Sequence, residues 1–206
     1  LGRIGVAASS DERVVVFSER IDTLDWLQAE LRRRLKFPTK AINGLLAVEV
    51  LHAGLSDEKI QAVVEGFGQK ASPIRILIAS DMASEGLNLH KECHQLVHYD
   101  LPWSFIRIQQ RNGRIDRYGQ LHSPQIAALA LAAEDDVTDD LNVVTKLLQK
   151  EHEANRALGD AEVLLDLHDS KIEEETVMEA IRTGRDLDDL VPEPTPERLN
   201  PFARLM

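Results

Sequence analysis

The sequence lacks several features that would define a class of protein. Cys93 is the single cysteine among 206 residues, which excludes an internal disulfide and fits a reducing cytoplasm. No apolar run approaches the roughly 18 residues needed to span a bilayer. No basic segment followed by an apolar one opens the chain, as a signal peptide would. We therefore expect a cytoplasmic protein with no membrane partner.

The sequence also lacks the parts that hold a nucleoside triphosphate. No glycine is followed by lysine, so the loop G-x-x-x-x-G-K-[ST] and its phosphate-binding lysine are absent. No Asp-Glu pair ends an apolar strand, where it could hold Mg²⁺. Asp11-Glu12 precedes an apolar run, and Asp57-Glu58 stands where a helix is expected to begin. These residues alone are therefore not expected to bind and hydrolyse a nucleoside triphosphate.

One group of side chains has the residue types of a zinc site, namely His90, Cys93, His94 and His98. Structural zinc sites use paired ligands from two short segments, and no second pair follows here. Side chains alternate along a strand, so His98 would point away from some of the others. We expect loop and strand residues and no metal site.

The net charge of −11 is unevenly distributed. Residues 1–132 carry 16 Lys+Arg against 15 Asp+Glu, a net of +1, whereas residues 133–206 carry 8 against 20, a net of −12. A strongly acidic surface disfavours nucleic acid. Composition therefore leaves nucleic-acid binding open for the front and disfavours it for the tail.

The front of the chain alternates between strand-like and helix-like patterns. Short β-branched runs are typical of buried parallel strands, and apolar residues at helical spacing separate them. Strands joined by helices of ten or more residues indicate crossovers and a parallel sheet. We predict a three-layer α/β domain over residues 1–132, with strands at 14–17, 47–51, 74–79, 95–99 and 126–131, and helices at 24–35, after Ser56 and at 104–114.

Beyond residue 132 the pattern becomes helical and acidic. Leucine stripes predict helices from about residue 141 to Gly159, around 164–165 and at 173–182. The segment 192–201 has four prolines in ten residues and is typical of an extended tail. We predict an acidic helical extension over 133–206 that braces the sheet domain or begins a neighbouring one.

The run QRNGRIDRYGQ, Gln110 to Gln120, is the most informative stretch. On a helix, residues three apart share a face, so Arg114 and Arg117 would present two guanidinium forks to one object. Such forks suit bidentate phosphate recognition. The alternative is a solvated basic helix face. Because the run follows an expected strand, where open α/β sheets bind ligands, we predict phosphate binding.

Four segments occur in a fixed order along the chain: RVVVFSE at 13–19, HAGLS at 52–56, ASDMASEGLNL at 79–89, and QRNGRIDRYGQ. This set resembles the second RecA-like lobe of superfamily 2 helicases and translocases. It looks closest to bacterial Swi/Snf-type ATPases, where H-Y-D-x-P-W (98–103 here) and a final R-x-G-Q (117–120 here) are expected. The resemblance covers roughly residues 10–132.

The resemblance implies roles for particular residues. Arg114 and Arg117 match the arginine fingers that reach the γ-phosphate of ATP, and Arg111 stands where Swi/Snf members often have no arginine, so its role stays open. We expect Asp116 to form only a local salt bridge. The matched nucleotide-binding residues are Gly86, Asn88, Gln110, Arg114 and Arg117. The matched nucleic-acid-binding residues are Ser18, His52, Gly54 and Ser80, although 52–54 could equally be a lead-in to a helix.

The resemblance further implies the C-terminal motor lobe of a DNA-dependent ATPase, with RNA not excluded as the track. ATP and Mg²⁺ would be held mainly by an N-terminal ATPase lobe that these residues do not include, so the segment alone would be inactive. The alternative is a non-enzymatic interaction module whose acidic tail docks a protein partner. The intact arginine pair favours the motor, because a scaffold would not need it.

Overall fold

A computed structural model describes residues 1–84, 87–129 and 170–183. The chain divides into two compact units, one of Leu1–Leu101 with Gln109–Leu129 and one of Pro102–Ile108 with Ala130–Met206. Within the described ranges, no helix combines the length and the apolar character needed to cross a membrane.

The first unit is built on a five-stranded, wholly parallel sheet in the order β2-β3-β1-β4-β5. The register pairs Val14 with Ile76 on one side of β1 and Val15 with Leu96 on the other. The predicted α/β class and its five strands are thus confirmed, within a few residues at the strand ends. The strands are β1 (Val14–Phe17), β2 (Val48–Leu51), β3 (Ile76–Ala79), β4 (Gln95–His98) and β5 (Gln125–Ala128).

The helices mostly match the predicted ones. A single turn, α3, was not predicted, and α4 ends two residues before the predicted end at Arg114. The helix predicted at 173–182 is confirmed as α6, whereas the other helices predicted in the tail and its proline-rich end lie outside the described residues. The helices are η1 (Gly2–Ile4), α1 (Ile21–Arg34), α2 (Asp57–Phe67), α3 (Asp81–Ser84), α4 (Phe105–Asn112) and α6 (Ser170–Thr183).

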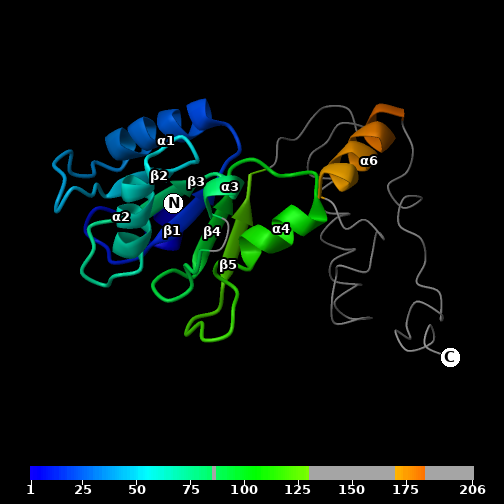
Figure 1. Cartoon of the computed structure of the whole chain (residues 1–206). Coiled ribbons are helices and arrows are strands. Elements are labelled where there is room, and N and C mark those ends of the chain that lie inside the picture. Colours follow the sequence, from blue (N-terminus) through cyan, green and yellow to red (C-terminus); the bar gives the residue numbers. More distant parts are fainter. Residues whose placement is uncertain (85–86, 130–169, 184–206) are drawn as a thin grey trace. The chain divides into compact units, whose positions relative to one another are not determined.

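The sheet of the first unit is covered on both faces. Side chains alternate along β1, so Val16 joins one apolar cluster with Leu24 of α1, while Phe17 joins another with Val63 and Phe67 of α2. Figure 1 shows α1 and α2 on different sides of the strands. Each fully buried aliphatic side chain contributes about 1.5–3 kcal/mol. The two clusters therefore hold three layers together: helix, sheet and helix.

A buried arginine joins the end of α2 to the start of β1. Arg13 is 4% exposed, and its guanidinium donates to the main-chain oxygens of Phe67, Gln69 and Lys70, the last two at 2.6 and 3.1 Å. Burial lowers the pKa of Arg13, and the charge of Arg75 adds to this effect. The side chain satisfies carbonyls that the end of a helix leaves without partners. Arg13 is thus a structural residue at the amino edge of the sheet.

The sheet order creates a crevice at the opposite, carboxyl edge. The chain leaves β1 toward β2 on one side of the sheet, and it leaves β4 toward β5 on the other side. Since β1 and β4 are neighbours, their carboxyl ends lie where the order reverses, which is where open α/β sheets bind ligands. A ligand site is therefore expected at this edge.

Candidate functional site at the carboxyl edge of the sheet

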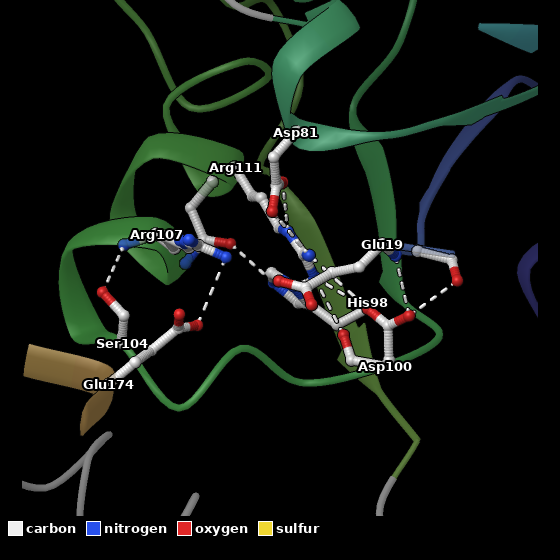
Figure 2. A network of polar contacts seen from close by, with 10 residues as sticks. Glu19, Asp81, His98, Asp100, Ser104, Arg107, Arg111 and Glu174 are labelled. Carbon is white, nitrogen blue, oxygen red and sulfur yellow. Dashed lines mark hydrogen bonds and ion pairs between the residues drawn. The ribbon is translucent and has the colours of Figure 1, made fainter. Parts of the chain in front are cut away.

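Arg111, in the last turn of α4, lies at the centre of a polar network at the carboxyl edge (Figure 2). Its side chain is 1% exposed. Nε and Nη2 donate to the two carboxylate oxygens of Asp81 at 2.6 and 2.9 Å, and Nη1 donates to the main-chain oxygen of Asp100 at 2.8 Å. The Asp100 carboxylate lies 3.5 Å away. One guanidinium thus meets two carboxylates.

The positions of these acids explain why the arginine is buried here. Asp81 begins α3 immediately after β3, and Asp100 comes two residues after β4. The ring of Phe17, at the end of β1, lies 5.4 Å from the guanidinium carbon of Arg111. Arg111 therefore connects the ends of three adjacent strands, and the paired charges make its burial tolerable.

Asp100 is held from its other side by the segment after β1. Ser18 Oγ donates to Asp100 Oδ2 at 2.6 Å, and the main-chain nitrogen of Glu19 donates to the same oxygen at 2.9 Å. These contacts cross from β1 to β4, over the crevice at which the sheet order reverses. The chain's own ion network therefore occupies the floor of this crevice.

His98 forms the last part of the network. It is 2% exposed, its Nε2 lies 3.0 Å from Asn112 Oδ1, and its Nδ1 lies 3.5 Å from Nη1 of Arg111. We assign the proton of the neutral ring to Nε2, because that nitrogen faces an acceptor while Nδ1 faces a donor. Burial lowers the pKa of His98 to about 4; the charge of Arg111 acts in the same direction and the Asn112 hydrogen bond opposes it.

The arginine motif leaves the helix earlier than the sequence predicted. Helix α4 ends at Asn112, and residues 113–119 form turns. The nitrogen of Gly113 still bonds to the oxygen of Gln109 at 2.8 Å, but that of Arg114 bonds to the oxygen of Arg111 at 3.1 Å, which tightens the chain. The prediction that Arg114 and Arg117 share a helix face is therefore wrong. Both lie on a turn that follows the helix.

This turn is attached to the segment that follows α3. The Arg117 guanidinium donates to Asn88 Oδ1, and the nitrogen of Leu89 donates to the oxygen of Arg114 at 3.1 Å. Gln120 closes the turn, since its Nε2 donates to the oxygens of Cys93 and Ile115, both at 3.0 Å. Two of the segments that carried the family resemblance are thus in direct contact.

The residues predicted to bind nucleotide differ in accessibility. Gln110, Asn88 and Arg117 are exposed, whereas Arg114 is half-buried. Asn88 and Arg117 are in contact with each other. Gly86 lies outside the described residues.

The residues predicted to contact nucleic acid all follow strand ends at the carboxyl edge. Ser18 comes directly after β1, His52 after β2 and Ser80 after β3. Ser18 and Ser80 are buried, and the hydroxyl of Ser18 is engaged by Asp100. His52 is half-buried, and its Nδ1 accepts a hydrogen bond from the nitrogen of the exposed Gly54 at 3.1 Å. His52 and Gly54 are therefore the more accessible members of this set.

The cluster considered for zinc is organised differently in the structure. His98 belongs to the Arg111 network, and Cys93 Sγ lies 3.2 Å from the oxygen of Gln95. Burial raises the pKa of the Cys93 thiol to about 11. Within residues 1–84, 87–129 and 170–183, no group of three or more His, Cys, Asp or Glu side chains could hold a metal ion.

The local salt bridge expected for Asp116 is absent. Asp116 is exposed, and it forms no ion pair with any residue in the described part of the chain. Its main-chain nitrogen instead donates to the oxygen of Asn112 at 2.8 Å. The side chain has no structural role at this position, which makes it a useful control.

Within the second unit, a separate ion pair joins two elements. Arg107 Nη1 lies 3.3 Å from Glu174 Oε1 on α6, and the nitrogen of Arg107 donates to Ser104 Oγ at 3.2 Å (Figure 2). Ser104 is buried and its hydroxyl caps the start of α4. The start of α4 and the acidic helix α6 are therefore linked inside this unit.

Sequence reasoning missed the Arg111 network. The signal for it was present, since an acid stands two residues after β3 and another two residues after β4, with an arginine in the helix that follows β4. Carboxyl ends of adjacent parallel strands lie at one edge, so these three charges had to be close. The sequence could not show that the arginine among them is buried.

Comparisons with known proteins show which proteins this chain is similar to. A model of the helicase conserved C-terminal domain matches residues 2–119. An uncharacterised ATP-dependent helicase, YqhH, of Bacillus subtilis is 30% identical over 155 residues, which are 75% of this chain and 25% of that protein. The RNA polymerase-associated protein RapA of Vibrio cholerae is 34% identical over 115 residues, which are 56% of this chain and 11% of that protein. The chain thus spans a quarter or less of these relatives.

A solved structure supports the fold. The C-terminal part of the Fun30 ATPase domain superposes with a TM-score of 0.53 at 20% identity, over 83% of this chain and 47% of that one. At this identity the likeness concerns the fold alone. It agrees with the RecA-like lobe that the order of the sequence motifs implied.

Proposed function

The chain belongs to the helicase conserved C-terminal domain family, and from this premise we propose that it is the second motor lobe of an ATP-dependent nucleic-acid translocase. Its part would be to supply two arginine fingers, Arg114 and Arg117, to ATP held at the surface of a first lobe. The observation that carries the proposal is the contact between Arg117 and Asn88, which joins the arginine turn to the segment expected beside the nucleotide.

The chemistry of the two side chains fits this role. A guanidinium is permanently charged and can stabilise charge on a transferring phosphoryl group, an effect worth about 10³–10⁵ in rate for an arginine finger. Both arginines lie on a turn beyond a helix end rather than inside a packed layer, and Arg117 is exposed. An exposed guanidinium can reach a nucleotide on a facing lobe.

ATP is the substrate in this proposal, and Mg²⁺ would accompany it on the first lobe. The described residues offer no group suited to a metal ion, and both Asp81 and Asp100 are engaged by Arg111. In this proposal Mg²⁺ is held by the first lobe and not by this chain. Its own contribution is to orient two positive charges.

The track would be nucleic acid, contacted through its backbone. DNA is our first choice, with RNA as the alternative that a binding assay would separate. His52 and Gly54, after β2, are the accessible candidates at the carboxyl edge. Contacts to phosphates carry no sequence information and weaken with salt. We expect little sequence preference and a cytoplasmic location.

The test uses the complete protein that contains this chain. Arg114→Ala or Arg117→Ala should lower kcat at least about a hundredfold and leave ATP affinity within about tenfold, because a finger acts on charge that develops in the transition state. Lysine should rescue poorly at both positions, since an ammonium cannot reproduce the fork.

The matched control is Asp116→Ala, which changes an exposed side chain on the same turn without an ion pair. Its turnover should stay within a few-fold of the wild type. Near-normal nucleic-acid-stimulated turnover in both arginine variants would reject the motor lobe and favour a non-enzymatic interaction module, with the acidic tail as its docking segment.

A further inference from the structure

We propose that Arg111 is a positioning residue that holds the finger turn, defined as residues 113–119, in its active geometry. This inference rests on the proposed function, because it concerns how Arg114 and Arg117 are aimed. Arg111 itself is 2% exposed and cannot reach a nucleotide on another lobe. It would act through the segments that it connects.

The first step is the position of Arg111 in the chain. It lies one residue before the end of α4, so the finger turn starts two residues later. Its fork fixes the helix end against Asp81 at 2.6 and 2.9 Å and against the oxygen of Asp100 at 2.8 Å. The place from which the finger turn departs is therefore set by the ends of β3 and β4.

The second step is that the finger turn is held at a second place. Asn88 bonds to Arg117, and the nitrogen of Leu89 bonds to the oxygen of Arg114. The turn is thus held at its start through Arg111 and again through Asn88 and Leu89. Releasing the Arg111 end would let the turn pivot about the remaining contacts, and a misplacement of about 1 Å can cost about a hundredfold in rate.

The third step is that a gain in stability alone does not explain why this ion network is present. Replacing a buried ion pair with apolar residues of similar volume is often neutral or stabilising. The group also sets two partly exposed acids against one buried arginine, with His98 held neutral. A planar guanidinium fork between two strand ends fixes their geometry. A lysine cannot do this, because its ammonium group cannot bridge both strand ends.

The chain offers a closely matched control in Arg13. Both arginines are buried, at 4% and 2% exposed, and each guanidinium lies against a phenylalanine ring, at 5.8 and 5.4 Å. Both join segments distant in the sequence. Arg13, however, lies at the amino edge, and its guanidinium donates to the main chain of residues 67–70 rather than to the segments that anchor the finger turn. Arg13→Lys should therefore destabilise the fold as Arg111→Lys does without moving the fingers.

The experiment compares Arg111→Lys and Arg13→Lys in the complete protein, with thermal melts and nucleic-acid-stimulated ATP hydrolysis. Both should lower the melting temperature. Arg111→Lys should also lower kcat at least about thirtyfold and keep KM for ATP within about threefold. The reason is that the variant loses the alignment of the two arginine fingers in the transition state. Arg13→Lys should keep kcat within about twofold, since its effect is confined to stability.

Equal kcat in the two variants would overturn the proposal, and so would a loss in Arg111→Lys that appears only in KM. If Arg111→Lys does not fold, Asp81→Asn carries the same test, because it keeps Arg111 and weakens its strongest anchor. Its kcat should fall at least about fivefold with KM unchanged, and an unchanged kcat would overturn the proposal.

The alanine variants of Arg114 and Arg117 separate this failure from that of the proposed function. If they keep normal turnover, the motor-lobe proposal fails and Arg111 has no fingers to position. If they lose turnover while Arg111→Lys retains it, only the positioning role is rejected.

Discussion

His98 should make the stability of the chain depend on pH in a way that one substitution removes. Its folded pKa of about 4 lies below the ordinary value of 6.5, because the ring is buried and Nδ1 faces Arg111. Between these values the unfolded chain binds a proton that the folded chain does not. The contribution of His98 is therefore fully present above pH 6.5 and is lost as the pH falls toward 4.

The magnitude follows from the width of this window. One pKa unit corresponds to about 1.4 kcal/mol, so the free energy of unfolding should fall by about 2 kcal/mol between pH 7 and pH 5 through His98 alone. In His98→Gln the amide can still donate to Asn112, as Nε2 does in the wild type, but it does not titrate. At pH 7 this variant should be less stable by about 1 kcal/mol, the value of a hydrogen bond, because it loses the contact of Nδ1 with Arg111.

Urea unfolding of the 206-residue chain at pH 7, 6 and 5 gives the measurement. The difference in free energy of unfolding between wild type and His98→Gln should change by about 2 kcal/mol, or roughly 1 M in urea midpoint, so that the variant becomes the more stable of the two at pH 5. Ser56→Ala is the control, because it removes the cap that Ser56 Oγ provides to the nitrogen of Lys59 at 3.3 Å and leaves His98 unchanged. A wild-type advantage over His98→Gln that stays constant from pH 7 to pH 5 would refute the assignment of a buried neutral imidazole.

Two further predictions concern the whole chain. Burial raises the pKa of Cys93 to about 11, so at pH 8 a thiol reagent should label the folded chain at least about a hundredfold more slowly than the urea-unfolded chain, and equal rates would contradict its burial. Residues 1–206 alone should hydrolyse ATP no faster than background, since they contain no phosphate-binding loop; a nucleic-acid-stimulated turnover near about 1 s⁻¹ from the purified chain would contradict this.

The sequence predicted the sheet well because buried parallel strands are short, continuous apolar runs. Val14–Phe17 is such a run, and its four residues are all buried. The end of α4 was predicted less well, since the pattern of Arg111 and Arg114 continues at helical spacing past Asn112. Gly113 and the tighter hydrogen bond from Arg114 to Arg111 end the helix there. Neither is visible in the spacing of the arginines, on which the prediction rested.

The role of Arg111 could not be read from local pattern. On spacing alone it is one of three similar arginines, and only Asp81 and Asp100, which lie far from it in the sequence, distinguish it. The contact of the Ser18 hydroxyl could not be read from the sequence for the same reason, because its partner Asp100 follows β4, which is adjacent to β1 in space but not in sequence. Long-range pairing decides which polar groups at a sheet edge remain available to a ligand.

The central position of β1 has a consequence for the order in which the chain is synthesised. Both neighbours of β1 lie far downstream, since Val14 pairs with Ile76 and Val15 with Leu96. At about 5–20 residues per second, a ribosome needs roughly 4–16 s to make the second partner after β1 has been made. Until β4 has been made, these four consecutive apolar residues lack at least one of their two native neighbouring strands, a state prone to aggregation. Nascent chains stopped before residue 96 should therefore depend on a chaperone far more than those stopped after β4.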